Sequence, residues 1–191
     1  MLHRTPRPVA AIAACLLVFV AADVASANGV VPGKPGTMDI VEIATAVNQA
    51  NGEFDYLLAA ATCPYFGGAI VDLLSGDDRY TLFAPTDAAF EALQRELGVE
   101  TPAPAVTCTL PQATVFNILA YHVTEGRRFS NSVFNRRSVK LVEMLNGQYI
   151  VTNPDLTIED NAGQTARPVL PLIDIKASNG VIHVIDTVLL P

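Results

Sequence analysis

The sequence predicts a single α+β domain, because its helical patterns come first along the chain and its strand patterns come last. Apolar residues recur at helical spacing between residues 38 and 122, whereas short alternating runs follow from residue 138 onward. Of the 191 residues, 50% are hydrophobic and 16% are charged, so the chain can bury a core without a metal. This order favours separate helical and sheet layers over repeated strand–helix–strand units.

The first 27 residues are typical of a cleavable export signal. Arg4 and Arg7 precede the apolar run Val9–Ala22, and residues 25–27, Ala-Ser-Ala, are the small residues that signal peptidase accepts. The run is shorter than the roughly 20 residues of a transmembrane helix, so we expect no transmembrane span. We therefore expect a secreted or periplasmic protein. A lipoprotein anchored through Cys15 is the alternative, because small residues also precede that cysteine.

Export also determines how the cysteines are interpreted, because thiols outside the cytoplasm tend to pair. Cys63 and Cys108 are the two cysteines that remain after the signal, so one bridge can form. A catalytic or metal-binding pair would need a closer spacing and a nearby histidine. We therefore expect a structural disulfide.

Residues 28–37 contain prolines and no apolar periodicity, so we expect a flexible lead followed by one domain over residues 38–191. The domain should open with three amphipathic helices. Asp39 and Glu42 form the pattern of a capping box at the first of them, and Asn51-Gly52 ends it. The apolar faces of the three helices are Ile40, Ile43, Ala44 and Val47; Phe54, Leu57, Leu58 and Ala61; and Ile70, Leu73 and Leu74.

A strand and two further helices should come next. The strand covers Arg79–Ala84, and Thr86 has the side chain to cap a helix directly after it. Asp87 is then a first-turn carboxylate favoured by the helix dipole. A proline-rich loop holds Cys108, and the last helix places His122 on its apolar stripe, so we expect this histidine to point inward.

Strands should make up the rest of the chain. Asn146-Gly147 and Asn179-Gly180 are hairpin signals between them. The expected strands cover residues 139–143, 148–152, 156–159, 170–175 and 181–190.

Three stretches of this pattern together resemble the fasciclin-like domain family. Tyr80–Phe90, with the sequence YTLFAPTDAAF, resembles the family's first conserved box. Leu119–Val123 resembles its central Tyr-His motif, and Asn179–Asp186 resembles its closing box. The resemblance covers residues 38–191 and implies a wedge-shaped β-sandwich of two sheets packed with an N-terminal group of helices. It also implies a module for adhesion or extracellular-matrix contact, without catalysis.

The resemblance implies two sets of partner-binding residues. An Asp-Ile pair before the closing box is linked to integrin binding in animal members, and Asp174-Ile175 stands in that place here. A Tyr-His motif is linked to the same activity and matches Tyr121 and His122. The alternative for His122 is a purely structural role, as a core histidine with buried hydrogen bonds.

A basic segment is a third candidate for partner binding. Arg127, Arg128, Arg136, Arg137 and Lys140 lie within 14 residues of an otherwise acidic chain. The segment is either a docking patch for an anionic partner or a solvated loop. Candidate partners are a cell-surface or matrix protein or an anionic polysaccharide, bound by a monomer.

The remaining function classes are less well supported. Without residues 1–27 the chain has 10 basic and 18 acidic groups, which disfavours nucleic-acid binding. The sequence has no nucleophile elbow, phosphate loop or zinc-protease motif, so we expect neither an enzyme nor a cofactor. A metal site would require His122 to meet His183. The main alternative to adhesion is a carrier of a small apolar ligand such as a carotenoid, held between helices and sheet.

Overall fold

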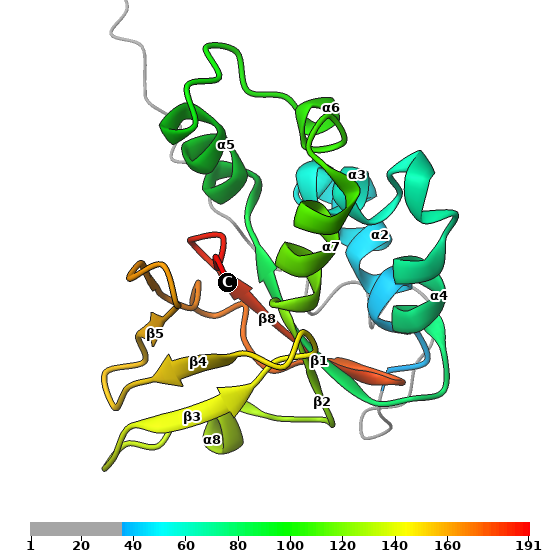
Figure 1. Ribbon diagram of the computed structural model, residues 1–191. Helices are drawn as coiled ribbons and strands as arrows, with labels where there is room; N and C mark the ends of the chain where they lie inside the picture. The colour runs from blue at the N-terminus through cyan, green and yellow to red at the C-terminus, as the bar shows by residue number, and fades with distance from the viewer. Residues whose placement is uncertain (1–35) are drawn as a thin grey trace, which may run out of the picture.

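A computed structural model describes residues 36–191, in which helices pack on a pair of β-sheets (Figure 1). The expected signal peptide, Cys15 and residues 28–35 of the expected lead lie outside the described residues. Within residues 36–191, every helix is too short or too polar to cross a membrane.

The helical layer contains the expected three N-terminal helices and the helix after the first strand. The capping box at the start of the first helix is confirmed. The Asp39 side chain accepts a hydrogen bond from the Glu42 backbone N–H at 2.8 Å, and the Glu42 side chain accepts one from the Asp39 backbone N–H at 2.9 Å. Thr86 caps its helix by accepting from Ala89 at 3.2 Å. The elements are α2 (Ile40–Asn51), α3 (Asp55–Ala61), η1 (Pro64–Phe66), α4 (Ala69–Ser75), α5 (Asp87–Glu96), α6 (Pro104–Thr107) and α7 (Gln112–Ala120).

Each of the two sheets has four strands in the described part of the chain. Sheet A has the order β2-β1-β8-β7 and sheet B the order β3-β4-β5-β6, and a short helix, α8 (Ser130–Val133), lies beside β3 in Figure 1. The strands are β1 (Tyr80–Pro85), β2 (Val123–Glu125), β3 (Lys140–Glu143), β4 (Tyr149–Thr152), β5 (Ile158–Glu159), β6 (Thr165–Ala166), β7 (Ile175–Ala177) and β8 (Gly180–Ile185).

The central strands of sheet A are buried on both faces, so the fold has three layers. Leu82 of β1 and Ile182 of β8 belong to the larger core, which lies against the helices. Phe83 and Ile185 alternate with them and belong to the second core, which includes the inward side chains of sheet B. The α+β class is confirmed, with sheet A between the helical layer and sheet B.

The sequence prediction left the pairing of the first strand open, and in the structure β1 and β8 run parallel, from Tyr80 opposite Gly180 to Pro85 opposite Ile185. Two details of the predicted elements are wrong. The last long helix ends at Ala120, and β2 follows it, because residues 123–125 pair with β1. The expected strand 170–175 is mostly turn, since Leu172 bonds back to Val169 and only the residues from Ile175 onward pair with β8.

Besides β2, four short elements have no counterpart in the sequence prediction. They are the 3-10 helix η1, α6, which lies in the expected loop before Cys108, α8 and the two-residue strand β6. Each is four residues or fewer, which is too short for a helical or alternating apolar pattern to appear.

Asp87 does more than interact with the dipole of its own helix. Its carboxylate accepts hydrogen bonds from the backbone N–H groups of Asp55 at 3.2 Å and Tyr56 at 3.1 Å, in the first turn of α3. In return, Glu53 accepts from the backbone N–H of Asp87 at 2.7 Å. These bonds join the starts of α3 and α5, and the Asp87 side chain is structural.

Asn179, in the turn before β8, joins three elements through one buried side chain. Its Oδ1 accepts from the backbone N–H of Ile40 at 3.0 Å, at the start of α2. Its Nδ2 donates to the carbonyl oxygens of Leu74 at 2.6 Å and Gly76 at 3.1 Å, at the end of α4. Asn179 therefore fixes the N-terminal helices against the edge of the β7–β8 hairpin.

Candidate functional site

Residues 126–130, which we call the crossing segment, pass over sheet A on the face opposite the helices. Thr81 of β1 donates to the carbonyl of Gly126 at 2.7 Å and accepts from the backbone N–H of Arg128 at 2.8 Å. β8 is the neighbouring strand of β1, and Nε2 of its residue His183 is 2.9 Å from the carbonyl of Arg128. The sheet thus holds the first part of the basic segment through its backbone, and the Arg127 and Arg128 side chains are half-buried.

Asp174 holds the far end of the crossing segment. Its two carboxylate oxygens accept from the backbone N–H of Ser130 at 2.6 Å and from its hydroxyl at 2.5 Å. Its own backbone N–H donates to Nδ1 of His183 at 3.3 Å. Asp174 adopts a φ of 59°, a left-handed conformation that is uncommon for a residue with a side chain. The structure therefore brings Asp174-Ile175 beside the basic segment, but the carboxylate is engaged within the domain.

None of the five cations of the basic segment forms an ion pair within 4.0 Å with a carboxylate of the described residues. Arg127 donates to the carbonyls of Ala177 at 3.0 Å and Ser178 at 2.6 Å, and Arg128 donates from Nε to the carbonyl of Glu125 at 2.9 Å. The ammonium of Lys140 meets the carbonyl of Ser132. Arg136 and Arg137 are exposed in the turn before β3. Over residues 36–191, the pair Arg95–Glu91 is the one Lys or Arg ion pair within 4.0 Å.

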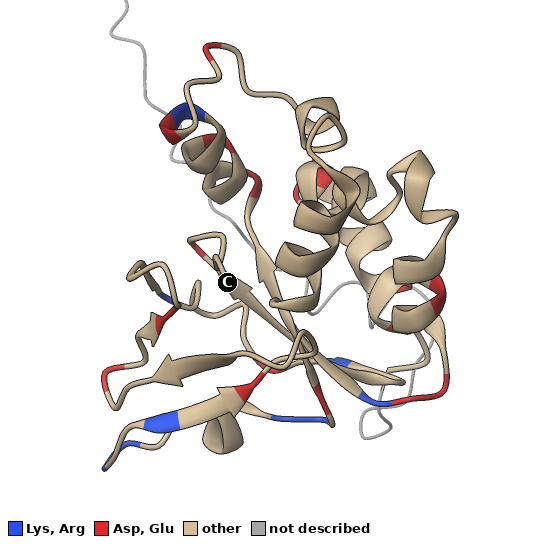
Figure 2. Ribbon diagram, in the orientation of Figure 1, with Lys and Arg blue, Asp and Glu red and all other residues tan. Residues whose placement is uncertain are grey.

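Charge is segregated along the described chain (Figure 2). Residues 36–126 contain 2 basic and 12 acidic side chains, a net charge of −10. Residues 127–191 contain 7 basic and 6 acidic side chains, a net charge of +1. The basic segment therefore lies in the part of the described chain that carries no net negative charge.

Tyr121 and His122 lie in the interior, between the helices and sheet B. The hydroxyl of Tyr121 donates to the carbonyl of Tyr149 at 2.8 Å and accepts from the backbone N–H of Asn161 at 3.2 Å. Both side chains are at most 1% exposed. A partner-binding role for them does not fit this placement, because a partner could not reach either side chain without opening the core.

The expected inward orientation of His122 is confirmed, and both ring nitrogens have backbone partners. Nδ1 lies 2.8 Å from the carbonyl of Ile118, to which it donates, and Nε2 accepts from the backbone N–H of Leu189 at 2.9 Å. Only the neutral ring can make this pair of bonds. Burial lowers the pKa of His122 from 6.5 to about 4, against smaller opposing effects of the Ile118 carbonyl and Asp160.

We expect His122 to make folding stability depend on pH. The pKa of His122 is lower in the folded state than in the unfolded state. Between these two pKa values the unfolded chain binds a proton at His122 and the folded chain does not. Stability should therefore fall as the pH drops from about 6.5 to about 4, by about 3 kcal/mol in total, and then level off. The test is to measure the free energy of unfolding across this pH range for the wild type and His122→Gln. The free energy of unfolding of the variant should depend less steeply on pH. A ring proton resonance of His122 that titrates near pH 6.5 would contradict the prediction.

Both ring nitrogens of His183 also have backbone partners. Nε2 donates to the carbonyl of Arg128 and Nδ1 accepts from the backbone N–H of Asp174. Burial lowers the pKa of His183. Neither histidine has a lone pair left for a metal. Among the residues that the structure describes, no three His, Cys, Asp or Glu side chains are grouped as a metal site. His183 is a structural residue that orients the crossing segment.

The described residues form an α+β domain with two four-stranded sheets, a helical layer and a Cys63–Cys108 disulfide. The chain belongs to the fasciclin domain family, because that family's model, described as the Fasciclin domain, matches residues 68–191. The resemblance predicted from the three sequence boxes is thereby confirmed. The match begins after α2 and α3, yet both helices pack into the same core as sheet A.

Relatives occur in bacteria and animals. Protein sll1735 of Synechocystis is 35% identical over 154 residues, which is 80% of this chain and 97% of that protein. Transforming growth factor-beta-induced protein ig-h3 of Sus scrofa is 30% identical over 121 residues, which is 62% of this chain and only 16% of ig-h3. A solved FAS1 domain pair from the insect cell adhesion molecule fasciclin I is 18% identical with a TM-score of 0.49, covering 70% of this chain and 43% of that one.

Proposed function

We propose that this protein is an exported, non-enzymatic surface-interaction module that contacts an anionic cell-surface or matrix partner through its basic segment. The observation that carries the proposal is the run of five cations, none of them in an ion pair within 4.0 Å, in a chain whose residues 36–126 have a net charge of −10. Adhesion is also what the fasciclin resemblance implies. The Cys63–Cys108 disulfide fits an exported protein, since such bonds persist in oxidising compartments.

The crossing segment supports the proposal because it gives the cations a fixed backbone. Arg128 is held between Thr81 and His183, and Ser130 is held by Asp174. A binding surface whose backbone is already ordered loses less conformational entropy when a partner docks. In this proposal Asp174 positions the segment, and Ile175, half-buried beside it, contributes apolar contact at its border.

Replacing Arg136 and Arg137 together by alanine should abolish retention of the protein on heparin at low salt. Both side chains are exposed, so the loss should leave the fold intact. The control is Arg79→Ala with Arg95→Ala, which removes the same charge from the acidic half. Equal loss of retention in both double variants would mean that net charge governs binding, and unchanged elution of the first would refute the role of the segment.

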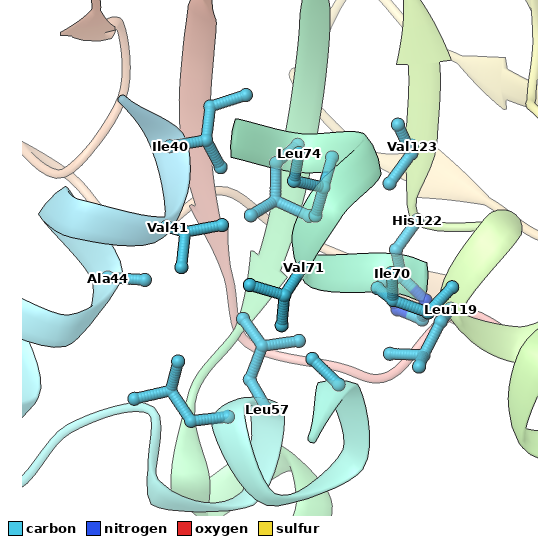
Figure 3. A pocket seen from close by; sticks show the side chains of 13 residues that line it. Ile40, Val41, Ala44, Leu57, Ile70, Val71, Leu74, Leu119, His122 and Val123 are labelled. Atoms are coloured by element: carbon cyan, nitrogen blue, oxygen red, sulfur yellow. The ribbon is translucent and has the colours of Figure 1, made fainter. Parts of the chain in front are cut away.

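The carrier alternative has less support from the structure. A fully apolar cavity between α2, α3, α4 and β1, with His122 at its border, holds about 40 Å³ (Figure 3). A second cavity between α5, α6 and α7 holds about 190 Å³. Sites for drug-sized ligands usually hold at least about 300 Å³. An extended pigment would therefore require the helices to separate from one another.

A further inference from the structure

We propose that residues 135–141, which we call the basic–apolar tip, dock on an anionic lipid surface. In this mode Val139 and Leu141 enter the headgroup region while Arg136 and Arg137 bind lipid phosphates. The inference rests on the proposed function and names the partner of its basic segment.

The tip exposes large apolar side chains that the fold does not need on its surface. Val139 is 58% exposed and Leu141 is 63% exposed. Leu141 cannot turn inward, because its neighbour Val142 is fully buried opposite Ile150 and side chains alternate along β3. A polar residue would serve equally well at an outward strand position. The exposed leucine is therefore available for a contact outside the domain.

The two arginines lie directly before these apolar residues, in a turn to which the Asn135 side chain is hydrogen-bonded. Asn135 accepts from the backbone N–H of Arg137 at 3.0 Å and donates to the hydroxyl of Ser138 at 2.8 Å. Guanidinium groups match phosphate oxygens with two parallel hydrogen bonds, which suits arginine to lipid headgroups. Cations flanking apolar side chains are the combination that binds an anionic bilayer surface.

An anionic lipid fits the tip better than a polysaccharide does. A sugar polymer would neutralise the arginines but would leave the two aliphatic side chains in water. The nearby aromatic ring of Phe134 is buried, so it offers no surface on which a sugar could stack. Apolar burial and phosphate contact together use the exposed charged and apolar side chains of the tip, Arg136, Arg137, Val139 and Leu141.

The acidic neighbours of the tip define how it meets the surface. Glu143 lies on the same face of β3 as Leu141, two residues further along, or about 7 Å away. Glu159 lies on that face too, opposite Val151 of β4. An anionic surface would repel both carboxylates if the sheet lay flat on it. The tip therefore docks end-on, with the rest of sheet B pointing away.

The test is co-sedimentation of the exported protein with vesicles of phosphatidylcholine, with and without phosphatidylglycerol. The wild type should bind the anionic vesicles and not the neutral ones. Val139→Ser with Leu141→Ser should bind the anionic vesicles about tenfold more weakly, while its retention on heparin stays unchanged. The matched control is Leu97→Ser with Leu170→Ser, which removes two equally exposed leucines outside the tip and should bind like the wild type.

The other outcomes separate the two proposals. Vesicle binding by the serine variant at wild-type strength would overturn the insertion of the tip. Retention on heparin without vesicle binding by the wild type would overturn the lipid partner, favour a polysaccharide and leave the proposed function standing. Failure to bind either probe would refute both. Circular dichroism of each variant shows whether it is folded, and all variants share the same N-terminal segment, so differences between them report on the substituted residues.

Discussion

Replacing Gly180 by alanine should lower the free energy of unfolding by about 3 kcal/mol or more. A Cβ at this position would lie 2.1 Å from the carbonyl oxygen of Tyr80 and 2.6 Å from Cδ1 of Ile40. The isoleucine can move, but the Tyr80 carbonyl belongs to β1, directly opposite Gly180 in the parallel pairing. Relief therefore requires the two central strands of sheet A to separate. Denaturant unfolding followed by circular dichroism measures the loss.

Two further variants isolate this cause. In Gly76→Ala the new Cβ would lie 3.4 Å from the carbonyl of Asp72, at a φ of −73° that any residue adopts, so the effect should stay below about 1 kcal/mol. Adding Ile40→Val to Gly180→Ala removes the Cδ1 contact and leaves the backbone contact in place. Stability should then remain low. Full recovery in this double variant would show that the isoleucine, and not the strand pairing, makes glycine necessary.

The parts of the fold that could be predicted from the sequence depend on neighbouring residues. The capping box of Asp39 and Glu42, the Thr86 cap and the hairpin at Gly147 each join residues a few positions apart. Their geometry follows from local backbone chemistry, such as the positive φ of 80° that Gly147 adopts in its turn. Local patterns of this kind are visible in a single sequence.

The pairing of β1 with β8 could not be predicted, because its strands are 100 residues apart in the chain. The resemblance to the family identified the boxes that contain Tyr80 and Gly180, but no periodicity shows that the two residues are opposite each other. The same holds for Asn179, whose side-chain bonds reach Ile40 and Leu74 across more than 100 residues. Long-range contacts leave no regular spacing in the sequence.

The same distinction between local patterns and long-range contacts applies to the candidate site. The cluster of basic residues is visible in the sequence, whereas the clamp that Thr81, His183 and Asp174 form on the crossing segment is not. His122 points inward as predicted, but for another reason. It lies beyond the end of α7, and its position is fixed by hydrogen bonds to Ile118 and to Leu189 near the C-terminus.

Removing the disulfide by Cys63→Ala with Cys108→Ala should lower the free energy of unfolding by roughly 4 kcal/mol on the chain-entropy model. The expected bridge is confirmed: it joins the chain after α3 to the end of α6, with Cα atoms 5.5 Å apart and a sequence separation of 45. Without it, the unfolded chain gains the freedom of an open loop of that length. Urea titration of the oxidised wild type and the double variant measures the loss.

Reduction of the wild type separates the bridge from the packing of its sulfur atoms. The reduced protein keeps both sulfurs but loses the covalent link, so its stability should fall nearly as far as that of the double variant. The remaining difference reports the small cavity left at Cys63, which is buried, and should be about 1 kcal/mol. Equal stability of the oxidised and reduced wild type would contradict the prediction, because the closed loop would then not restrict the unfolded chain.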